Sequence, residues 1–204
     1  MVDVCCLLPI GLFFFILLMQ RRYRAKVNTN FEIIAGQLGM GFNPGHGFNG
    51  TVMSGEAGRF RHRCKLYFER RRSGRKRRSA TLVARVGFLK PRSIGLEITP
   101  QGFLAEGITI GSPSRQDIQI GHQEFDSGFR IRGFDEFRVK EFLDPERIRA
   151  ILAFKKSTHW FNRMTIDDEG VTVRLPSTNG ENPDYLKDMI SQMLELASRI
   201  EKLR

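Results

Sequence analysis

A histidine and three carboxylates lie close together in one short stretch of the sequence, at Asp117, His122, Glu124 and Asp126. Such a group could transfer protons as a general acid and base, or hold a metal ion weakly through nitrogen and oxygen ligands. The simpler interpretation is structural, because Asp117 and Asp126 stand where turns should begin, and aspartate there accepts hydrogen bonds from backbone N–H groups. We favour the structural interpretation and keep the four residues as weak catalytic candidates.

The sequence offers little other support for catalysis. No two of its four histidines have the spacing of zinc ligands, and it contains no C-x₂-C pair. It also lacks a Walker phosphate-binding loop and the G-x-S-x-G motif that positions a nucleophilic serine. We therefore predict no metal and no cofactor, and an enzyme with a polar site around Asp117–Asp126 is the alternative rather than the leading hypothesis.

Positive charge is concentrated in one part of the chain. The formal net charge is +11, and residues 59–78 alone contain eleven Lys or Arg against one Glu. Basic and acidic residues are equal in number from residue 79 to the end. The high isoelectric point is therefore a property of residues 59–78 and of a second basic cluster near the N-terminus.

Residues 59–86 are predicted to form a basic hairpin. Basic residues alternate with less polar ones from Arg59 to Leu66, which places the charges on one face of a strand. Ser73-Gly74 is a turn signal, and Thr81–Val86 is predicted to be the returning strand. The candidate residues for binding an anionic partner are Arg59, Arg61, Arg63, Lys65, Arg70, Arg71, Arg72, Arg75, Lys76, Arg77 and Arg78.

Three interpretations of the basic hairpin remain open. It could be a solvated charged surface with no specific partner. It could contact anionic lipid, where each basic residue near the surface contributes about 1 kcal/mol, or an acidic protein. Nucleic acid is the less favoured partner, because no recognised nucleic-acid-binding module is present.

The N-terminal segment is predicted to be a transmembrane anchor over residues 1–20. No charge occurs between Val4 and Met19, and as a helix this stretch would span about 24 Å of a hydrocarbon core about 30 Å thick. A cleaved signal peptide does not fit, because the preceding residues carry no Lys or Arg and no small-residue cleavage site follows. A basic juxtamembrane collar occupies residues 21–27, with its charges at Arg21, Arg22, Arg24 and Lys26.

This arrangement predicts a topology. Because basic residues flank the cytoplasmic side of membrane spans, the expectation is a single-pass signal anchor in the inner (cytoplasmic) membrane, with the C-terminal domain cytoplasmic. Cys64 is alone in that domain and cannot form an internal disulfide.

Residues 28–204 are predicted to form one α+β domain with a mostly antiparallel sheet. Thr29-Asn30-Phe31-Glu32 matches the capping-box pattern, with Thr29 as the N-cap and Glu32 three residues later, and predicts that a helix begins there. Asp135, Asp144-Pro145 and Asn182-Pro183 predict the starts of three more helices. The last is long, and its apolar residues fall on one stripe suited to packing on the sheet: Leu186, Met189, Ile190, Met193, Leu194, Ala197 and Ile200.

A resemblance covers about residues 115–175. Phe125-Asp126, Phe129, Asp135, Phe142-Leu143 and the helix after Asp144 resemble the pattern of an uncharacterised bacterial family of membrane-tethered domains of unknown function. The resemblance implies a membrane-bound protein and supplies no activity or catalytic residues. The leading hypothesis is therefore a membrane-anchored binding or scaffolding protein whose basic hairpin contacts anionic lipid or an acidic partner. A membrane-tethered nucleic-acid-binding protein is a further alternative.

Overall fold

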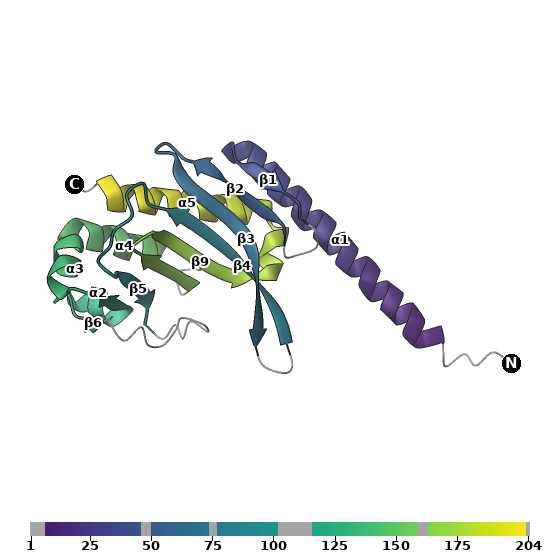
Figure 1. The fold of residues 1–204 in the computed structure, drawn as a ribbon, viewed down its shortest axis with the longest axis horizontal. Helices are drawn as coiled ribbons and strands as arrows, with labels where there is room; N and C mark the ends of the chain where they lie inside the picture. Colours follow the sequence, from purple (N-terminus) through teal and green to yellow (C-terminus); the bar gives the residue numbers. More distant parts are fainter. Residues whose placement is uncertain (1–6, 46–49, 74–76, 102–115, 159–162, 203–204) are drawn as a thin grey trace.

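The computed structural model describes residues 7–45, 50–73, 77–101, 116–158 and 163–202. In these residues one antiparallel sheet of nine strands has the order β1-β2-β3-β4-β9-β8-β5-β7-β6. Figure 1 shows the sheet with helices α1 and α5 on one side and the short helices α2, α3 and α4 at one end. The strands are β1 (Gly41–Asn43), β2 (Val52–Ala57), β3 (His62–Ser73), β4 (Arg77–Gly87), β5 (Glu97–Pro100), β6 (Gln116–Ile118), β7 (Phe129–Gly133), β8 (Met164–Asp167) and β9 (Gly170–Pro176).

The helices follow the predicted α+β pattern, and most of the predicted caps are present. Asp135 and Asp144 each accept two backbone N–H bonds at a helix start, and Asn182 accepts one from Tyr185 at 3.0 Å. These bonds satisfy N–H groups that have no partner within the helix. The described helices are α1 (Leu7–Leu38), α2 (Gln123–Gly128), α3 (Glu136–Phe142), α4 (Pro145–Ser157), the 3₁₀ helix η3 (Ser177–Glu181) and α5 (Pro183–Lys202).

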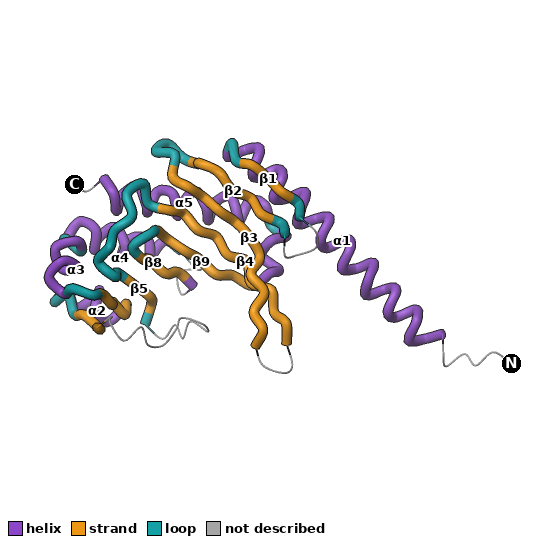
Figure 2. The backbone as a smooth tube through the Cα atoms, viewed as in Figure 1, coloured by secondary structure: helices purple, strands orange, loops and turns teal. Residues whose placement is uncertain are grey.

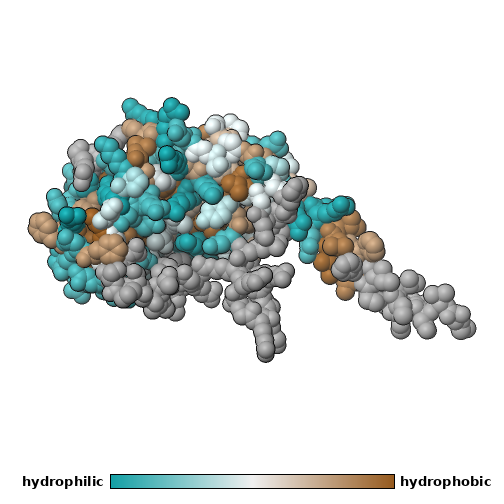
Figure 3. All heavy atoms as spheres, viewed as in Figure 1, coloured by the Kyte–Doolittle hydropathy of each residue, from teal (hydrophilic) through white to brown (hydrophobic). Residues whose placement is uncertain are grey.

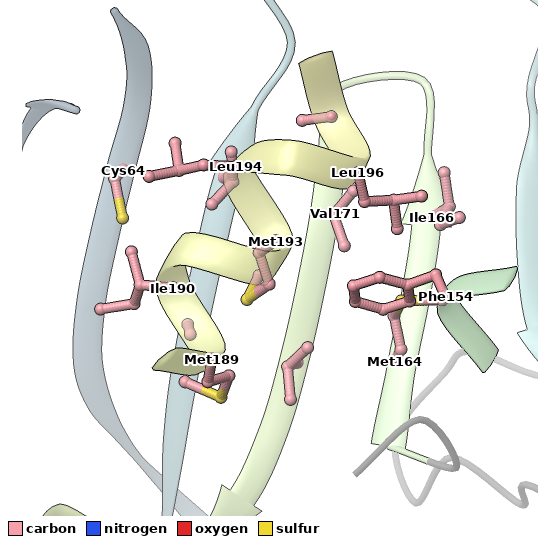
Figure 4. Close-up of a cluster of buried hydrophobic side chains, with 14 of the residues drawn as sticks. Cys64, Phe154, Met164, Ile166, Val171, Met189, Ile190, Met193, Leu194 and Leu196 are labelled. Carbon is pink, nitrogen blue, oxygen red and sulfur yellow. The ribbon is translucent and has the colours of Figure 1, made fainter. Parts of the chain in front are cut away.

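One face of the sheet and the apolar stripe of α5 form the main core. Along β3, Cys64, Leu66 and Phe68 are buried while Arg63 and Lys65 are exposed, as the alternation of a half-buried strand requires. Figure 4 shows Met193 and Leu196 of α5 in the cluster of side chains from β8, β9 and α4. The predicted stripe is confirmed: every member is buried, namely Leu186, Met189, Ile190, Met193, Leu194, Ala197 and Ile200.

Helix α1 corrects two predictions about the N-terminal segment. It runs for 32 residues without interruption, so Thr29 lies inside a helix and does not begin one. Its C-terminal half belongs to the domain core, where Val27, Phe31 and Ile34 are at most 1% exposed. The collar and the start of the domain are therefore parts of one continuous helix.

The transmembrane prediction is wrong for the part of the chain that the structure describes. None of its helices combines the length and the apolar character that crossing a membrane requires. In α1 the apolar side chains from Phe14 to Met19 are followed directly by Gln20, Arg21 and Arg22. The described apolar stretch of the helix is therefore too short to cross a membrane. The predicted single-pass signal anchor in the inner membrane, and the topology derived from it, are not supported.

The N-terminal part of α1 projects from the body of the domain (Figure 2). Its apolar side chains form a patch, brown in Figure 3, beside the hydrophilic part of the same helix. The large side chains of this patch are between 40% and 61% exposed. Exposed apolar surface of this extent is typical of a contact surface. The residues are Leu12, Phe14, Phe15, Ile16, Leu17, Leu18 and Met19.

Candidate anionic-partner interface

The basic hairpin is present as strands β3 and β4, and its outer part projects from the sheet. The two strands pair continuously from Cys64–Val86 to Ser73–Arg77. In the described chain, β2 pairs with β3 only as far as Tyr67, and β9 pairs with β4 only from Thr81. Residues 68–73 and 77–80 therefore form a two-stranded ribbon, which extends below the body of the domain in Figure 1.

The structure places the predicted basic residues in three groups. Arg59 and Arg61 lie in the turn before β3, so the alternating strand begins later than predicted. Arg63 and Lys65 lie on β3 with exposed side chains. Of the others, Arg75 and Lys76 fall outside the described residues, and only the strand backbone is described for Arg70, Arg71, Arg72, Arg77 and Arg78.

The exposed charges on β3 differ from other basic groups on the same sheet. Within the described residues, neither Arg63 nor Lys65 has a carboxylate at ion-pair distance, and Lys65 Nζ lies 5.1 Å from the centroid of the Tyr67 ring. By contrast, Arg85, directly across from Lys65 in the register, pairs with Glu169. The positive charge on β3 is therefore open to an external anion.

Part of the collar contacts the domain, through Tyr23 and Lys26. Lys26 Nζ lies 3.1 Å from Glu181 Oε2 in η3. Close by, the Tyr23 hydroxyl donates to the Ser177 carbonyl at 2.7 Å, and Asn30 Nδ2 donates to the Gly180 carbonyl at 3.2 Å. Arg21 and Arg22 are exposed, and Arg24 is half-buried. The sequence pattern did not predict this connection between α1 and η3, because its partners are far apart in the chain.

The four catalytic candidates do not converge on one point. His122 caps α2 by accepting from Phe125 N at 3.3 Å, and Asp126 accepts from Ile120 N and Gly121 N, each at 2.9 Å. Glu124 Oε1 lies 2.9 Å from Lys156 Nζ. Each of these three side chains therefore has a partner within the domain.

Asp117, the fourth candidate, is held by two arginines of β7. Its carboxylate accepts from Arg130 Nη2 at 2.8 Å and from Arg132 Nε at 2.9 Å. A pocket of about 350 Å³ near this edge of the sheet is lined by Asp117 and Asp126 but not by His122 or Glu124. In the described residues no group of histidine, cysteine and carboxylate side chains could hold a metal ion. Two of the four candidates therefore share a pocket, and His122 and Glu124 do not reach it.

The two arginines lower the pKa of Asp117 to about 2, chiefly through the hydrogen bonds from Arg130 and Arg132. Because the folded pKa is below that of the unfolded chain, the bonds stabilise the fold above about pH 4 and this contribution is lost as the pH falls towards 2. The side chain is 60% exposed, so solvent screening limits the effect to less than about 1 kcal/mol.

We predict that Asp117→Asn lowers the free energy of unfolding at pH 7 by less than about 1 kcal/mol. The difference from the wild type should shrink as the pH falls towards 2 and disappear only below it, because the Asp117 carboxyl, with its pKa of about 2, is fully protonated only at lower pH. Urea denaturation at a series of pH values checks this. A constant difference across the whole range would show that the charge of Asp117 is not what stabilises the fold.

The sequence analysis also missed a buried polar contact that fixes the end of α5. His62, 1% exposed, has its ring nitrogens 3.1 Å from the Gly87 carbonyl and from Ser198 Oγ. Glu201 accepts from the backbone N–H groups of Leu89 and Lys90 at 3.1 Å. No local signal predicts these contacts, because they join the start of β3 to a helix far along the chain.

Comparison with known proteins adds a fold-level likeness. No family model and no curated protein matches the chain, so the resemblance over residues 115–175 stays a prediction. Among solved structures, the chain is similar to the mycobacterial trehalose monomycolate transport factor A, TtfA, with a TM-score of 0.51 and 9% sequence identity. The match covers 87% of this chain and 93% of the other. At this identity the likeness concerns the fold alone.

Proposed function

We propose that the protein is a non-catalytic binding or scaffolding protein whose basic hairpin contacts the headgroups of anionic lipid. The observation that carries the proposal is the separation of charge: residues 59–78 hold eleven basic residues against one acidic residue, while the chain after them is balanced. The proposal concerns contact between the hairpin and a lipid surface and involves no membrane-spanning segment.

The pairing pattern elsewhere on the sheet supports this assignment. Arg85 and Arg130 have carboxylate partners within the domain, so their fields are largely cancelled at a distance. Arg63 and Lys65 are exposed and have no such partner among the described residues. Among the described side chains of the hairpin, Arg63 and Lys65 therefore carry uncompensated charge, whereas Arg61 Nε lies 2.7 Å from Glu56 Oε2.

The shape of the hairpin supports a flat anionic partner. The ribbon of residues 68–73 and 77–80 extends past its neighbouring strands, so it can approach a surface before the body of the domain does. Basic residues contribute about 1 kcal/mol each when they come within a Debye length, about 8 Å at physiological salt. Three such contacts would strengthen binding by about 100-fold.

The structural neighbour is a likeness of fold. TtfA is described as a trehalose monomycolate transport factor. At 9% sequence identity, nothing about the partners or cargo of TtfA can be transferred to this protein. The proposal therefore depends on the charge distribution and on the projecting ribbon.

The test is binding of the full-length protein to vesicles of phosphatidylserine in phosphatidylcholine, measured by co-sedimentation. Seven glutamine substitutions in the hairpin should reduce binding by about 100-fold or more. The full chain is needed because α1 is part of the core, and a fragment starting at residue 27 would cut that helix. The substituted residues are Arg70, Arg71, Arg72, Arg75, Lys76, Arg77 and Arg78.

A matched control removes the same charge from other exposed positions and should bind nearly as well as the wild type. Equal binding by the hairpin variant and the wild type would contradict the proposal. Retention by an acidic protein or by RNA, without preference for anionic over neutral vesicles, would also contradict it and favour the other partners. The control substitutes glutamine at Lys90, Lys140, Arg149, Lys156, Arg163, Lys187 and Arg199, all exposed.

A further inference from the structure

The apolar patch of α1 lies on the part of the helix that projects from the body of the domain (Figure 2). Within the described residues, α1 joins the hydrophobic core only from Tyr23 onward, so the patch takes no part in it. In Figure 1 the projecting part of α1 and the ribbon of the basic hairpin both extend below the body of the domain. The patch and the hairpin can therefore meet the same external surface.

The patch is apolar on every side of the helix. Five consecutive residues, Phe15 to Met19, are each between 40% and 58% exposed. Because successive residues of an α-helix are about 100° apart, five in a row point all around its axis. Helix α5 is different, since its apolar residues form one stripe that packs on the sheet. The patch therefore has no single face on which one partner could cover it.

This distribution of apolar side chains separates the possible partners. A groove in another protein, or the same helix of a second copy, covers one side of a helix and leaves the opposite side in water. The acyl chains of lipid enclose an inserted helix on all sides. From Leu12 to Met19 the patch is about 12 Å long, less than half of a hydrocarbon core about 30 Å thick. One leaflet can therefore take it up without the helix crossing the membrane.

The residues that follow the patch suit an anionic surface. Helix α1 contains no acidic residue before Glu32. Arg21 and Arg22 come directly after Gln20, and both side chains are exposed. With the patch among acyl chains, these two arginines would lie at the level of the headgroups, where each basic residue contributes about 1 kcal/mol. The helix thus presents apolar surface and positive charge in the order in which a leaflet presents acyl chains and anionic headgroups.

We propose that the apolar patch of α1 inserts into one leaflet of the lipid surface that the basic hairpin contacts. This inference rests on the proposed function, because the hairpin brings the domain to that surface. The patch then adds a hydrophobic contribution to binding that salt does not screen, whereas the contribution of the hairpin weakens as salt rises. The two contributions can therefore be measured separately.

The experiment is fluorescence quenching of the full-length protein by vesicles of phosphatidylserine in phosphatidylcholine whose acyl chains carry bromine. Phe15→Trp places a fluorophore in the patch, and we expect the vesicles to quench at least half of its emission. Phe137→Trp is the control, since that exposed residue of α3 lies at the other end of the domain (Figure 1) and should not be quenched. The natural Trp160 is present in every variant, so its signal is measured in the wild type and subtracted.

Co-sedimentation at several salt concentrations measures the energetic contribution of the patch. Substituting glutamine at Phe15, Leu17 and Leu18 should weaken vesicle binding at least tenfold at every salt concentration and leave the dependence on salt unchanged. The matched control removes three exposed apolar side chains elsewhere and should bind like the wild type. It substitutes glutamine at Ile33, Leu89 and Phe137.

The outcomes distinguish this inference from the proposed function. No quenching of Phe15→Trp, while the wild type binds anionic vesicles with a steep salt dependence, would overturn the insertion and leave the hairpin contact standing. Quenching of Phe15→Trp with a flat salt dependence would contradict the hairpin contact and retain the insertion. A lower molar mass of the vesicle-free triple variant than of the wild type, without quenching, would instead assign the patch to contact between two copies of the chain.

Discussion

Replacing Arg147 with alanine should lower the free energy of unfolding by about 3–5 kcal/mol, the usual cost of removing one partner of a buried charged group. The guanidinium is 3% exposed and bonds to three separate acceptors, the carbonyls of Phe142 and Ile200 and the carboxylate of Asp144. Alanine would leave the buried carbonyls without their donor and remove the contact between the guanidinium and the Phe142 ring.

Urea denaturation followed by circular dichroism measures this effect. Arg147→Lys should recover less than half of the lost stability, because an ammonium on one flexible stem cannot serve all three acceptors. Arg149→Ala, two residues along α4 and exposed, should change stability by less than about 0.5 kcal/mol. A loss below about 1 kcal/mol for Arg147→Ala would mean that this network does not join α4 to α5.

The second large effect concerns α1. Phe31→Ala should cost about 3–5 kcal/mol, the range for truncating a buried phenylalanine. The side chain is fully buried, and its ring stacks on that of Phe68 in β3 with centroids 5.7 Å apart. This contact ties α1 to the strand that carries the basic hairpin.

The matched control for Phe31 is on the same helix. Ile33 is 46% exposed, so Ile33→Ala should cost less than about 1 kcal/mol, since little apolar area leaves water there on folding. Similar losses for the two variants in urea denaturation would contradict the conclusion that the C-terminal half of α1 is part of the core.

Local patterns predicted the elements of the domain well. The alternation from Arg63 to Leu66 in β3, the caps at Asp135 and Asp144 and the apolar stripe of α5 each depend on neighbouring residues, and the structure confirms them. The pairing of the two hairpin strands could also be predicted from the sequence, because these strands are adjacent in the chain. The α+β class follows from these elements.

Predictions failed where contacts between residues far apart in the sequence determine the local structure. Thr29 has the local pattern of a helix start, yet the helix continues through it because Val27, Phe31 and Ile34 pack on the domain. The same continuity explains the wrong transmembrane prediction, since charge and core contacts extend along one helix. The bonds from Arg147 to the Phe142 and Ile200 carbonyls were missed because they join segments that no local pattern connects.

The most direct test of the proposed hairpin function is the salt dependence of vesicle binding. Binding of the full-length protein to phosphatidylserine-containing vesicles should be strong at low salt and fall steeply towards about 1 M, where the Debye length is about 3 Å. The hairpin variant with seven glutamines should show weak binding and a nearly flat dependence, while the control with seven glutamines elsewhere should follow the wild type. A wild-type curve that stays flat with salt, or equal slopes for wild type and hairpin variant, would contradict an electrostatic contact made by the basic hairpin.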